Sequence, residues 1–323
     1  MGLLSILAIT WIVVFSPNWT TTEVVEKFIL LTVLINFPHF MSTYILMYSS
    51  PFTVKNYRWS STWIPLILLV YGIFATISSA HNDFFVSTLT FTAGAYLAWH
   101  YTGQTWGMIA VFSRMTGSAF SDRERMWVRL GLKFFLAFHL WWFLTVFLSS
   151  KNLAPETMLD LYPLVSGLLI GGGILFGTLG YGLNISRLKI IPDVRVLIPF
   201  VAVSVWYVAM SVEPKAIFWV QIGHSIQYLM FPLRIEINDV KAKKERFLWW
   251  DAIKYLTILT AACGVVFGLL PWLIDLLIIN EKMRIGAKES LVAFVNIHHF
   301  FADGAIWKVS NPDVRKKLFF HLK

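Results

Sequence analysis

Apolar residues occur along the chain in long continuous runs that are separated by short polar stretches. The runs do not alternate with polar residues, so they are typical of membrane-spanning helices and not of β-barrel strands. A helix needs about 20 apolar residues to cross a bilayer. The pattern therefore predicts ten spans, approximately at 3–16, 27–48, 62–80, 84–113, 133–149, 161–182, 195–211, 215–234, 254–279 and 289–308.

Composition supports this fold class. Apolar residues make up 57% of the 323 residues and charged residues 14%, whereas a soluble domain is about 25% charged. Only helices and closed barrels satisfy the backbone inside lipid. We therefore expect an all-α polytopic membrane bundle that forms a single integral-membrane domain over residues 1–323.

The distribution of basic residues predicts the topology. With the N-terminus in the cytoplasm, 21 of the 27 Lys and Arg residues fall on the cytoplasmic side and six on the other side. This asymmetry follows the positive-inside rule and places both termini in the cytoplasm. It also accounts for the net charge of +9 without a nucleic-acid partner. The KAKKER run at 241–246 is expected to lie near anionic lipid headgroups.

Six of the eight histidines lie inside predicted spans, where polar groups are costly and are usually functional. His39, His100, His224 and His298 lie on four spans that run in the same direction. They are nine to thirteen residues from the cytoplasmic ends of these spans, which is roughly 14–20 Å in a helix. The pattern predicts that these histidines meet at one depth, together with His299, which follows His298 directly.

Polar residues accompany these histidines at offsets of three or four, which place two side chains on the same helix face. A metal-bound imidazole typically donates its second ring N–H to such a neighbour. Amides precede three of the histidines, and further polar residues follow three of them. The amides are Asn36, Gln221 and Asn296, and the following residues are Gln104, Gln227, Tyr228 and Asp303.

These side chains predict a metal site. Imidazoles with one carboxylate suit iron, zinc or copper, and the single cysteine, Cys263, excludes a cysteine-based site. Five histidines and Asp303 exceed the need of one zinc ion, so we expect an open-sided iron site, with one or two ions, that activates dioxygen on a lipophilic substrate. The predicted ligands are His39, His100, His224 and His298 or His299. Asp303 is expected to bridge the metal or orient His299, and Gln104, Gln227, Tyr228 and Asn296 to support the imidazoles or contact the substrate.

Four short stretches carry a family resemblance: FPHF at 37–40, WHY at 99–101, GHSIQY at 223–228 and HHFFAD at 298–303. They resemble motifs of the Brp/Blh-type membrane β-carotene central-cleavage oxygenases of bacteria and archaea. The resemblance implies multispan helices, non-haem iron at the histidines, dioxygen and a polyene substrate. We expect the protein to lie in the bacterial inner membrane. The matches cover a small part of the chain. The family's first motif continues with Gly and Asp, whereas Phe40 and Met41 follow His39 here.

The same histidines would also suit three other functions. A zinc-dependent hydrolase of lipid amides or esters would polarise a carbonyl and activate water. A haem electron-transfer protein would use histidines from different spans as axial ligands, although His298 and His299 point about 100° apart on a helix and cannot both face one haem. A proton-coupled transporter would use them as a relay. For His139 a helix–helix hydrogen bond is the favoured interpretation, and whether it joins the site stays open.

Overall fold

The computed structural model describes residues 6–7, 10, 30–49, 51–244 and 249–307. Within these ranges the regular elements are helices, and no strand occurs. The chain divides into two compact units. Unit 1 contains Gly94–Gly223, and unit 2 contains Val24–Ala93 and His224–Lys323 together. The all-α prediction is confirmed for the described residues, and the prediction of a single domain stays a prediction.

Five helices among the described residues are long and apolar enough to cross a membrane, which supports a membrane protein. The predicted ten spans and the orientation of the termini stay predictions, and most of the predicted span 3–16 lies outside the described residues. The helices that carry the predicted site histidines are not among the five. The five are Trp59–Ser78, Asp122–Ser150, Glu156–Leu188, Val194–Val212 and Trp249–Leu277.

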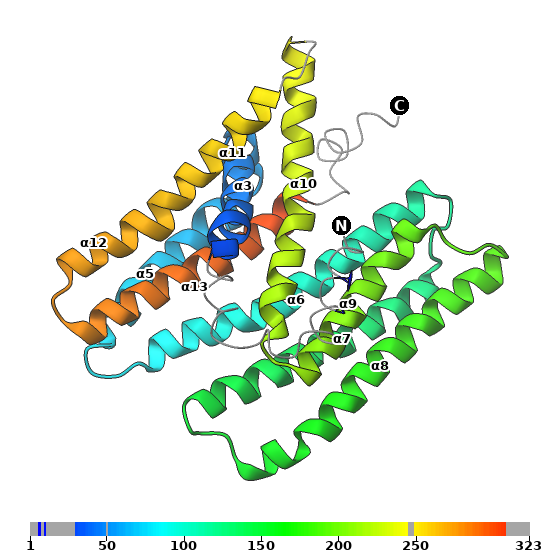
Figure 1. The fold of residues 1–323 in the computed structure, drawn as a ribbon, viewed down its shortest axis with the longest axis horizontal. Coiled ribbons are helices and arrows are strands. Elements are labelled where there is room, and N and C mark those ends of the chain that lie inside the picture. Colours follow the sequence, from blue (N-terminus) through cyan, green and yellow to red (C-terminus); the bar gives the residue numbers. More distant parts are fainter. Residues whose placement is uncertain (1–5, 8–9, 11–29, 50, 245–248, 308–323) are drawn as a thin grey trace. The chain divides into compact units, whose positions relative to one another are not determined.

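Unit 1 is built around two long helices, α7 (Asp122–Ser150) and α8 (Glu156–Leu188), which lie side by side (Figure 1). The sequence SDRE starts α7 with a capping box, because Ser121 and Glu124 satisfy each other's backbone N–H groups. Helix α9 (Val194–Val212) packs against both α7 and α8. Helices α6 (Phe84–Met115) and α10 (Ala216–Lys244) each continue from one unit into the other.

Glycines let the backbones of α7 and α8 approach each other. A Cβ atom added to Gly131 on α7 would lie 2.6 Å from both the carbonyl oxygen of Gly173 and the backbone nitrogen of Gly177 on α8. Small residues at helix contacts are common in membranes, where close packing replaces the hydrophobic effect as the force between helices. The glycine-rich run from 167 to 177 is therefore used, at Gly173 and Gly177, for helix packing.

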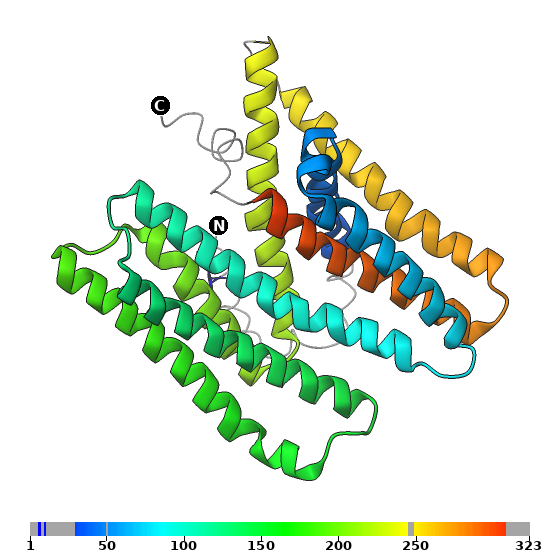
Figure 2. The same cartoon turned by 180° about the vertical axis from the view of Figure 1, so that it is seen from behind.

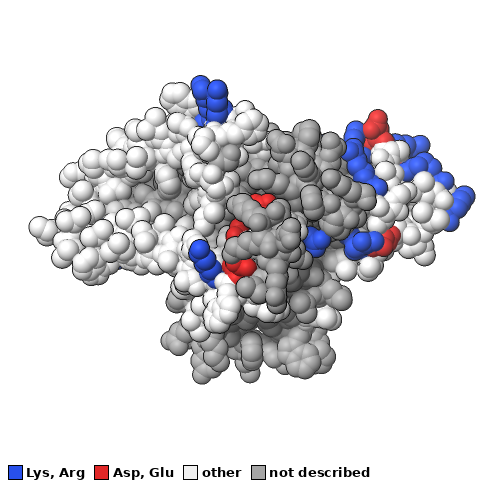
Figure 3. Space-filling view, turned by 90° about the horizontal axis from the view of Figure 1, so that it is seen from above, with Lys and Arg blue, Asp and Glu red and all other residues white. Residues whose placement is uncertain are grey.

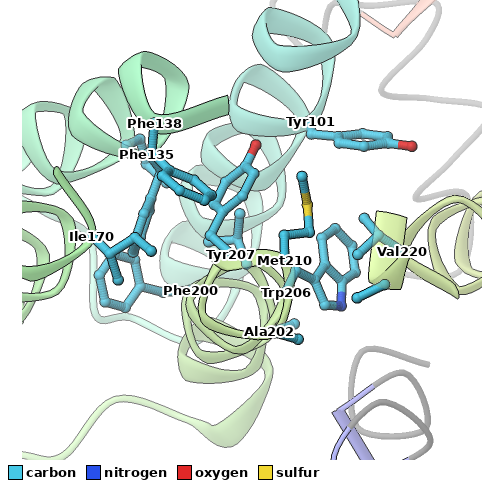
Figure 4. Packing of buried hydrophobic residues seen from close by; sticks show 14 of the residues in the cluster. Tyr101, Phe135, Phe138, Ile170, Phe200, Ala202, Trp206, Tyr207, Met210 and Val220 are labelled. Atoms are coloured by element: carbon cyan, nitrogen blue, oxygen red, sulfur yellow. The ribbon is translucent and has the colours of Figure 1, made fainter. Parts of the chain in front are cut away.

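Aromatic side chains fill the centre of unit 1 (Figure 4). Phe135 and Phe138 of α7 pack against Tyr207 of α9, with ring centroids 5.4 and 5.6 Å apart. His139 is fully buried beside them, and its Nδ1 atom lies 3.3 Å from the Tyr207 hydroxyl. This contact between α7 and α9 agrees with the interpretation of His139 as a helix–helix hydrogen-bonding residue.

Charged residues gather at one end of unit 1. Figure 3 shows Lys and Arg side chains at one edge of the face in view, over the turns that join α6 to α7 and α8 to α9. Arg187 holds these turns together, because its Nη2 donates to the carbonyl oxygen of Ala119 at 2.7 Å. At the start of α9, hydrogen bonds from Arg195 lower the pKa of the Asp193 carboxyl to about 2. The basic residues of two predicted cytoplasmic loops thus lie at the same end of the unit.

Unit 2 brings together helices from both ends of the sequence. Its first part contains η2 (Thr32–Asn36), α3 (Phe37–Tyr48), α4 (Pro51–Asn56), η3 (Trp59–Trp63) and α5 (Ile64–Ser78). Its second part contains α11 (Trp249–Cys263), η4 (Gly264–Leu269), α12 (Leu270–Leu277) and α13 (Glu281–Ile306). Helix α13 packs along α5 and also against α3 (Figure 2). This long-range packing brings the two ends of the predicted histidine pattern together.

Candidate metal centre

His39 lies at the start of α3, directly after a π-helical turn. The η2 turn ends at Asn36, and the N–H of Phe37 bonds to the carbonyl oxygen of Thr32, five residues back. Pro38 follows in the first turn of α3 and, because it has no N–H, cannot donate to a carbonyl of the preceding turn. Single π-turns are frequent at functional sites. The His39 side chain is fully buried.

Helix α13 supplies the second imidazole and the carboxylate. His299 and Asp303 are four residues apart and therefore share a helix face, and both are buried. His299 Nε2 lies 3.6 Å from Asp303 Oδ2, which is too long for a hydrogen bond. Two ligand atoms that bind one ion at about 2.1 Å, with a tetrahedral angle between them, are about 3.4 Å apart. The observed spacing therefore suits two ligands of one ion.

Thr43 holds the other oxygen of Asp303. Its hydroxyl donates to Asp303 Oδ1 at 2.7 Å, so the carboxylate is anchored to α3 as well as to α13. Thr43 is not among the predicted site residues, although it follows His39 by four residues, the same offset that Gln104 has from His100 and Asp303 from His299.

His39, His299 and Asp303 meet inside unit 2. The His39 and His299 rings are perpendicular, with centroids 4.5 Å apart. Candidate ligand atoms of these three buried residues lie within 4.8 Å of one another, and this group could hold a metal ion. His100 is buried on α6 in unit 1, and its role as a ligand stays a prediction. The prediction of a buried His/Asp cluster is thus confirmed, while the identity of the metal is a separate question.

Helix α10 covers the His39 ring from another side. The His224 and Tyr228 rings both lie edge-on to His39, with centroids 5.2 and 4.5 Å away. The adjacent Ser225 hydroxyl donates to Asn36 Oδ1 at 2.6 Å, which fixes α10 against the end of η2. Among the described residues, the group within 4.8 Å does not include His224. The structure therefore places His224 and Tyr228 as neighbours of His39.

His298 faces a different part of unit 2 from His299. Its Nε2 atom lies 3.1 Å from the carbonyl oxygen of Ser60 and 3.2 Å from the Tyr48 hydroxyl. The Tyr44 ring stacks on the His298 ring at a centroid distance of 4.9 Å. Neighbouring residues on a helix point about 100° apart, and of the two adjacent histidines it is His299 whose ligand atom joins the group.

The remaining predicted residues lie in different surroundings. Asn296 is half-buried, and its amide donates to the carbonyl oxygen of Val292 on its own helix at 2.8 Å. Gln104 is half-buried on α6. The side chain of Gln227 lies outside what the structure describes. His139 lies in unit 1 beside Tyr207 and, in the part of the chain that the structure describes, is not in the group.

Aromatic rings surround this group in unit 2. The Phe40 ring lies 4.7 Å from His299, and Trp307 packs edge-on against Tyr228 at 5.3 Å. Such surroundings exclude water, and low polarity strengthens the attraction between a cation and the Asp303 carboxylate. Imidazoles with one carboxylate fit a transition-metal ion such as iron or zinc. The residues present therefore suit the metal that the sequence predicted.

The chain matches no family model, no curated protein and no solved structure. The functional interpretation therefore rests on the geometry of the buried group.

Proposed function

We propose that the protein is an integral-membrane metalloenzyme, a non-haem iron oxygenase that acts on a lipophilic, carotenoid-like or lipid-like substrate. One observation carries this proposal: three buried side chains of unit 2, the imidazoles of His39 and His299 and the carboxylate of Asp303, offer ligand atoms within 4.8 Å of one another. A buried charge in a membrane protein is costly unless it is paired or binds a metal. A bound metal ion would offset the cost of burying these side chains together.

The donor set favours iron. His39, His299 and Asp303 are two histidines and one carboxylate, the set that non-haem iron oxygenases use while leaving coordination positions open. An iron ion held this way supplies dioxygen activation. Asp303 lowers the net charge of the site, and Thr43 keeps the carboxylate oriented through the bond to Oδ1.

The surroundings favour an apolar substrate. Phe40 and Tyr228 present aromatic rings beside His299 and His39, and a site in apolar helices admits molecules that partition into lipid. Dioxygen is one such molecule. Tyr228 would contact the substrate, since its ring lies against His39. The motif resemblance to polyene-cleaving oxygenases supports a carotenoid-like chain.

Elemental analysis of the detergent-purified protein tests the proposal. Wild-type protein is expected to contain iron, and the variants His39→Ala, His299→Ala and Asp303→Asn are expected to lose it. His139→Ala is the matched control, because His139 is equally buried but lies beside Tyr207 in unit 1. Equal metal content in all five proteins would overturn the proposal. Dioxygen uptake with a polyene or lipid substrate then tests the reaction.

The same donor set supports a second function. Three protein ligands and a water molecule also suit catalytic zinc, which would hydrolyse a lipid amide or ester. Purified protein that contains zinc without iron, and that releases fatty acid without consuming dioxygen, would establish the hydrolase in place of the oxygenase.

A further inference from the structure

Pro65 changes the hydrogen bonding of the preceding helical turn. Trp59–Trp63 form the π-helical element η3, and the N–H of Ile64 bonds to the carbonyl oxygen of Trp59, five residues back. In the same π-helical register, the donor for the Ser60 carbonyl would be the N–H of residue 65, five residues on. In the α-helical register, the donor for the Ser61 carbonyl would also be the N–H of residue 65, four residues on. Proline has no N–H. The sequence SSTWIP therefore presents two neighbouring carbonyl groups that need donors from elsewhere.

Two side chains supply these donors. His298 Nε2 lies 3.1 Å from the Ser60 carbonyl oxygen, and the Tyr48 hydroxyl donates to the Ser61 carbonyl oxygen at 2.8 Å. A carbonyl oxygen only accepts, so Nε2 of His298 must carry a hydrogen. The Tyr48 oxygen, 3.2 Å from the same nitrogen, is a second acceptor for it. The tautomer of His298 is thereby fixed, with Nε2 used for hydrogen bonding.

These bonds tie three helical segments together. His298 belongs to α13, Tyr48 to α3, and Ser60 to η3 at the start of α5. Tyr44, one turn before Tyr48, stacks on the His298 ring and donates to the carbonyl oxygen of Val295 on α13 at 2.7 Å. The contacts act on the side of α13 next to the face that carries His299 and Asp303. They resist rotation of α13 about its axis relative to α3.

We propose that His298 is a positioning residue for the metal centre and not one of its ligands. It fixes the rotation of α13, so that His299 and Asp303 face His39 and Thr43. The inference deepens the proposed function and rests on it for the metal-binding readout. The physical reason is geometric: a rotation of α13 by a small angle moves the ligand atoms of His299 and Asp303 away from His39 while leaving each side chain intact.

Three substitutions and a spectroscopic probe test this role. His298→Leu removes the donor, His298→Gln restores an N–H near the Nε2 position, and Tyr48→Phe removes the neighbouring donor. Metal-free protein in detergent is titrated with Co²⁺, whose visible spectrum reports ligand geometry. We expect His298→Leu to bind Co²⁺ about 10–100-fold more weakly, with an altered spectrum at saturation. Tyr48→Phe should show a smaller effect, and His298→Gln should recover most of the affinity and the wild-type spectrum.

Two results would overturn the inference. If His298→Leu and His298→Gln both fail to bind Co²⁺ at saturation, as His299→Ala should, then His298 is a ligand. If His298→Leu binds Co²⁺ with wild-type affinity and spectrum, then His298 does not position His299 and Asp303.

Thermal unfolding in the presence of chelator separates this inference from the proposed function. The contacts of His298 exist without metal, so His298→Leu should lower the metal-free midpoint and His298→Gln should restore it. An unchanged unfolding midpoint in His298→Leu would contradict the role of His298 in holding α13. Wild-type protein that binds neither iron nor Co²⁺ would refute the proposed function, while this comparison would still decide whether His298 holds α13.

Discussion

The Thr43 hydroxyl donates a 2.7 Å hydrogen bond to Asp303 Oδ1, and this bond joins α3 to α13 at the candidate metal centre. Both residues are buried. The same carboxylate faces His299 through its second oxygen. One side chain of α13 is thus shared between a structural bond to α3 and the candidate metal-binding group, so we expect the packing of the two helices to affect any affinity for metal.

Replacing Thr43 with valine should weaken both properties. Valine has nearly the same shape but cannot donate, so Asp303 Oδ1 loses this donor while it stays buried. We expect a loss of about 1–3 kcal/mol in unfolding free energy and weaker metal binding, by about 10-fold or more. Thermal unfolding with and without metal, together with a metal titration, measures both effects. Ser42→Ala is the control, because the Ser42 hydroxyl bonds to the His39 carbonyl of its own helix; an equal effect there would contradict the prediction.

Removal of the metal should destabilise the protein by mass action. A ligand that binds the folded state at 100 times its Kd adds about 2.7 kcal/mol to stability, so a chelator should lower the unfolding midpoint of the wild type. The variant His299→Ala should unfold at the same temperature with and without chelator, because it lacks a ligand. A chelator effect of wild-type size in His299→Ala would place the stabilising ion elsewhere.

Gly131→Ala should force α7 and α8 apart. The added methyl group would lie 2.6 Å from backbone atoms of Gly173 and Gly177, and backbone atoms cannot rotate away. We expect a loss of about 1–3 kcal/mol, the usual range for overpacking, seen as a lower unfolding midpoint in detergent. Gly171→Ala on α8 is the matched control, since no atom lies within 4 Å of its added Cβ. Its midpoint should stay the same or rise slightly; similar losses in both variants would show that helix packing is not the cause.

Arg187→Met should destabilise unit 1 more than Arg125→Met. Arg187 binds both oxygens of Glu124, a buried carboxylate whose side chain is 4% exposed. Removing this cation leaves the buried charge with fewer partners, so the unfolding midpoint should fall, by an amount that is limited because Arg187 itself is partly exposed. The pair between Arg125 and Asp122 is exposed and should contribute little.

Unfolding midpoints of the two variants test this difference. Adding Glu124→Gln to Arg187→Met should restore part of the loss, because glutamine is neutral and can keep the capping box with Ser121. Failure of this second change to restore any stability would argue that Arg187 acts through its bond to the Ala119 carbonyl oxygen instead.

The helices and the existence of a buried His/Asp cluster follow from local patterns in the sequence. Continuous apolar runs allow few structures other than helices in a membrane, and the similar depth predicted for His39 and His298 comes from counting residues within each predicted span. The contacts between these helices are harder to predict from the sequence. The bond between Thr43 and Asp303 depends on how α3 and α13 are rotated about their axes, which packing over the whole of unit 2 decides.

The different directions of the His298 and His299 side chains could be predicted from the sequence, but the contacts of His298 could not. Helix geometry indicates that adjacent histidines point in different directions, and the Asp303 offset favours His299 as the one with the local carboxylate. The role of His298 depends on Ser60, more than two hundred residues earlier. The Ser60 carbonyl group needs a donor because Pro65, which follows the π-turn, has no N–H. No periodicity in the sequence signals this pairing.

The pairing of α3 with α13 also sets the order of events during synthesis. Thr43 and Asp303 are 260 residues apart, so α3 leaves the ribosome long before α13 exists. During this interval the polar face of α3, with His39 and Thr43, lacks the helix that later covers it. The candidate metal centre therefore forms late, after the chain has been made through Asp303. A stalled or shortened chain would carry these polar groups without their partners, which gives quality-control proteases a feature by which to recognise it.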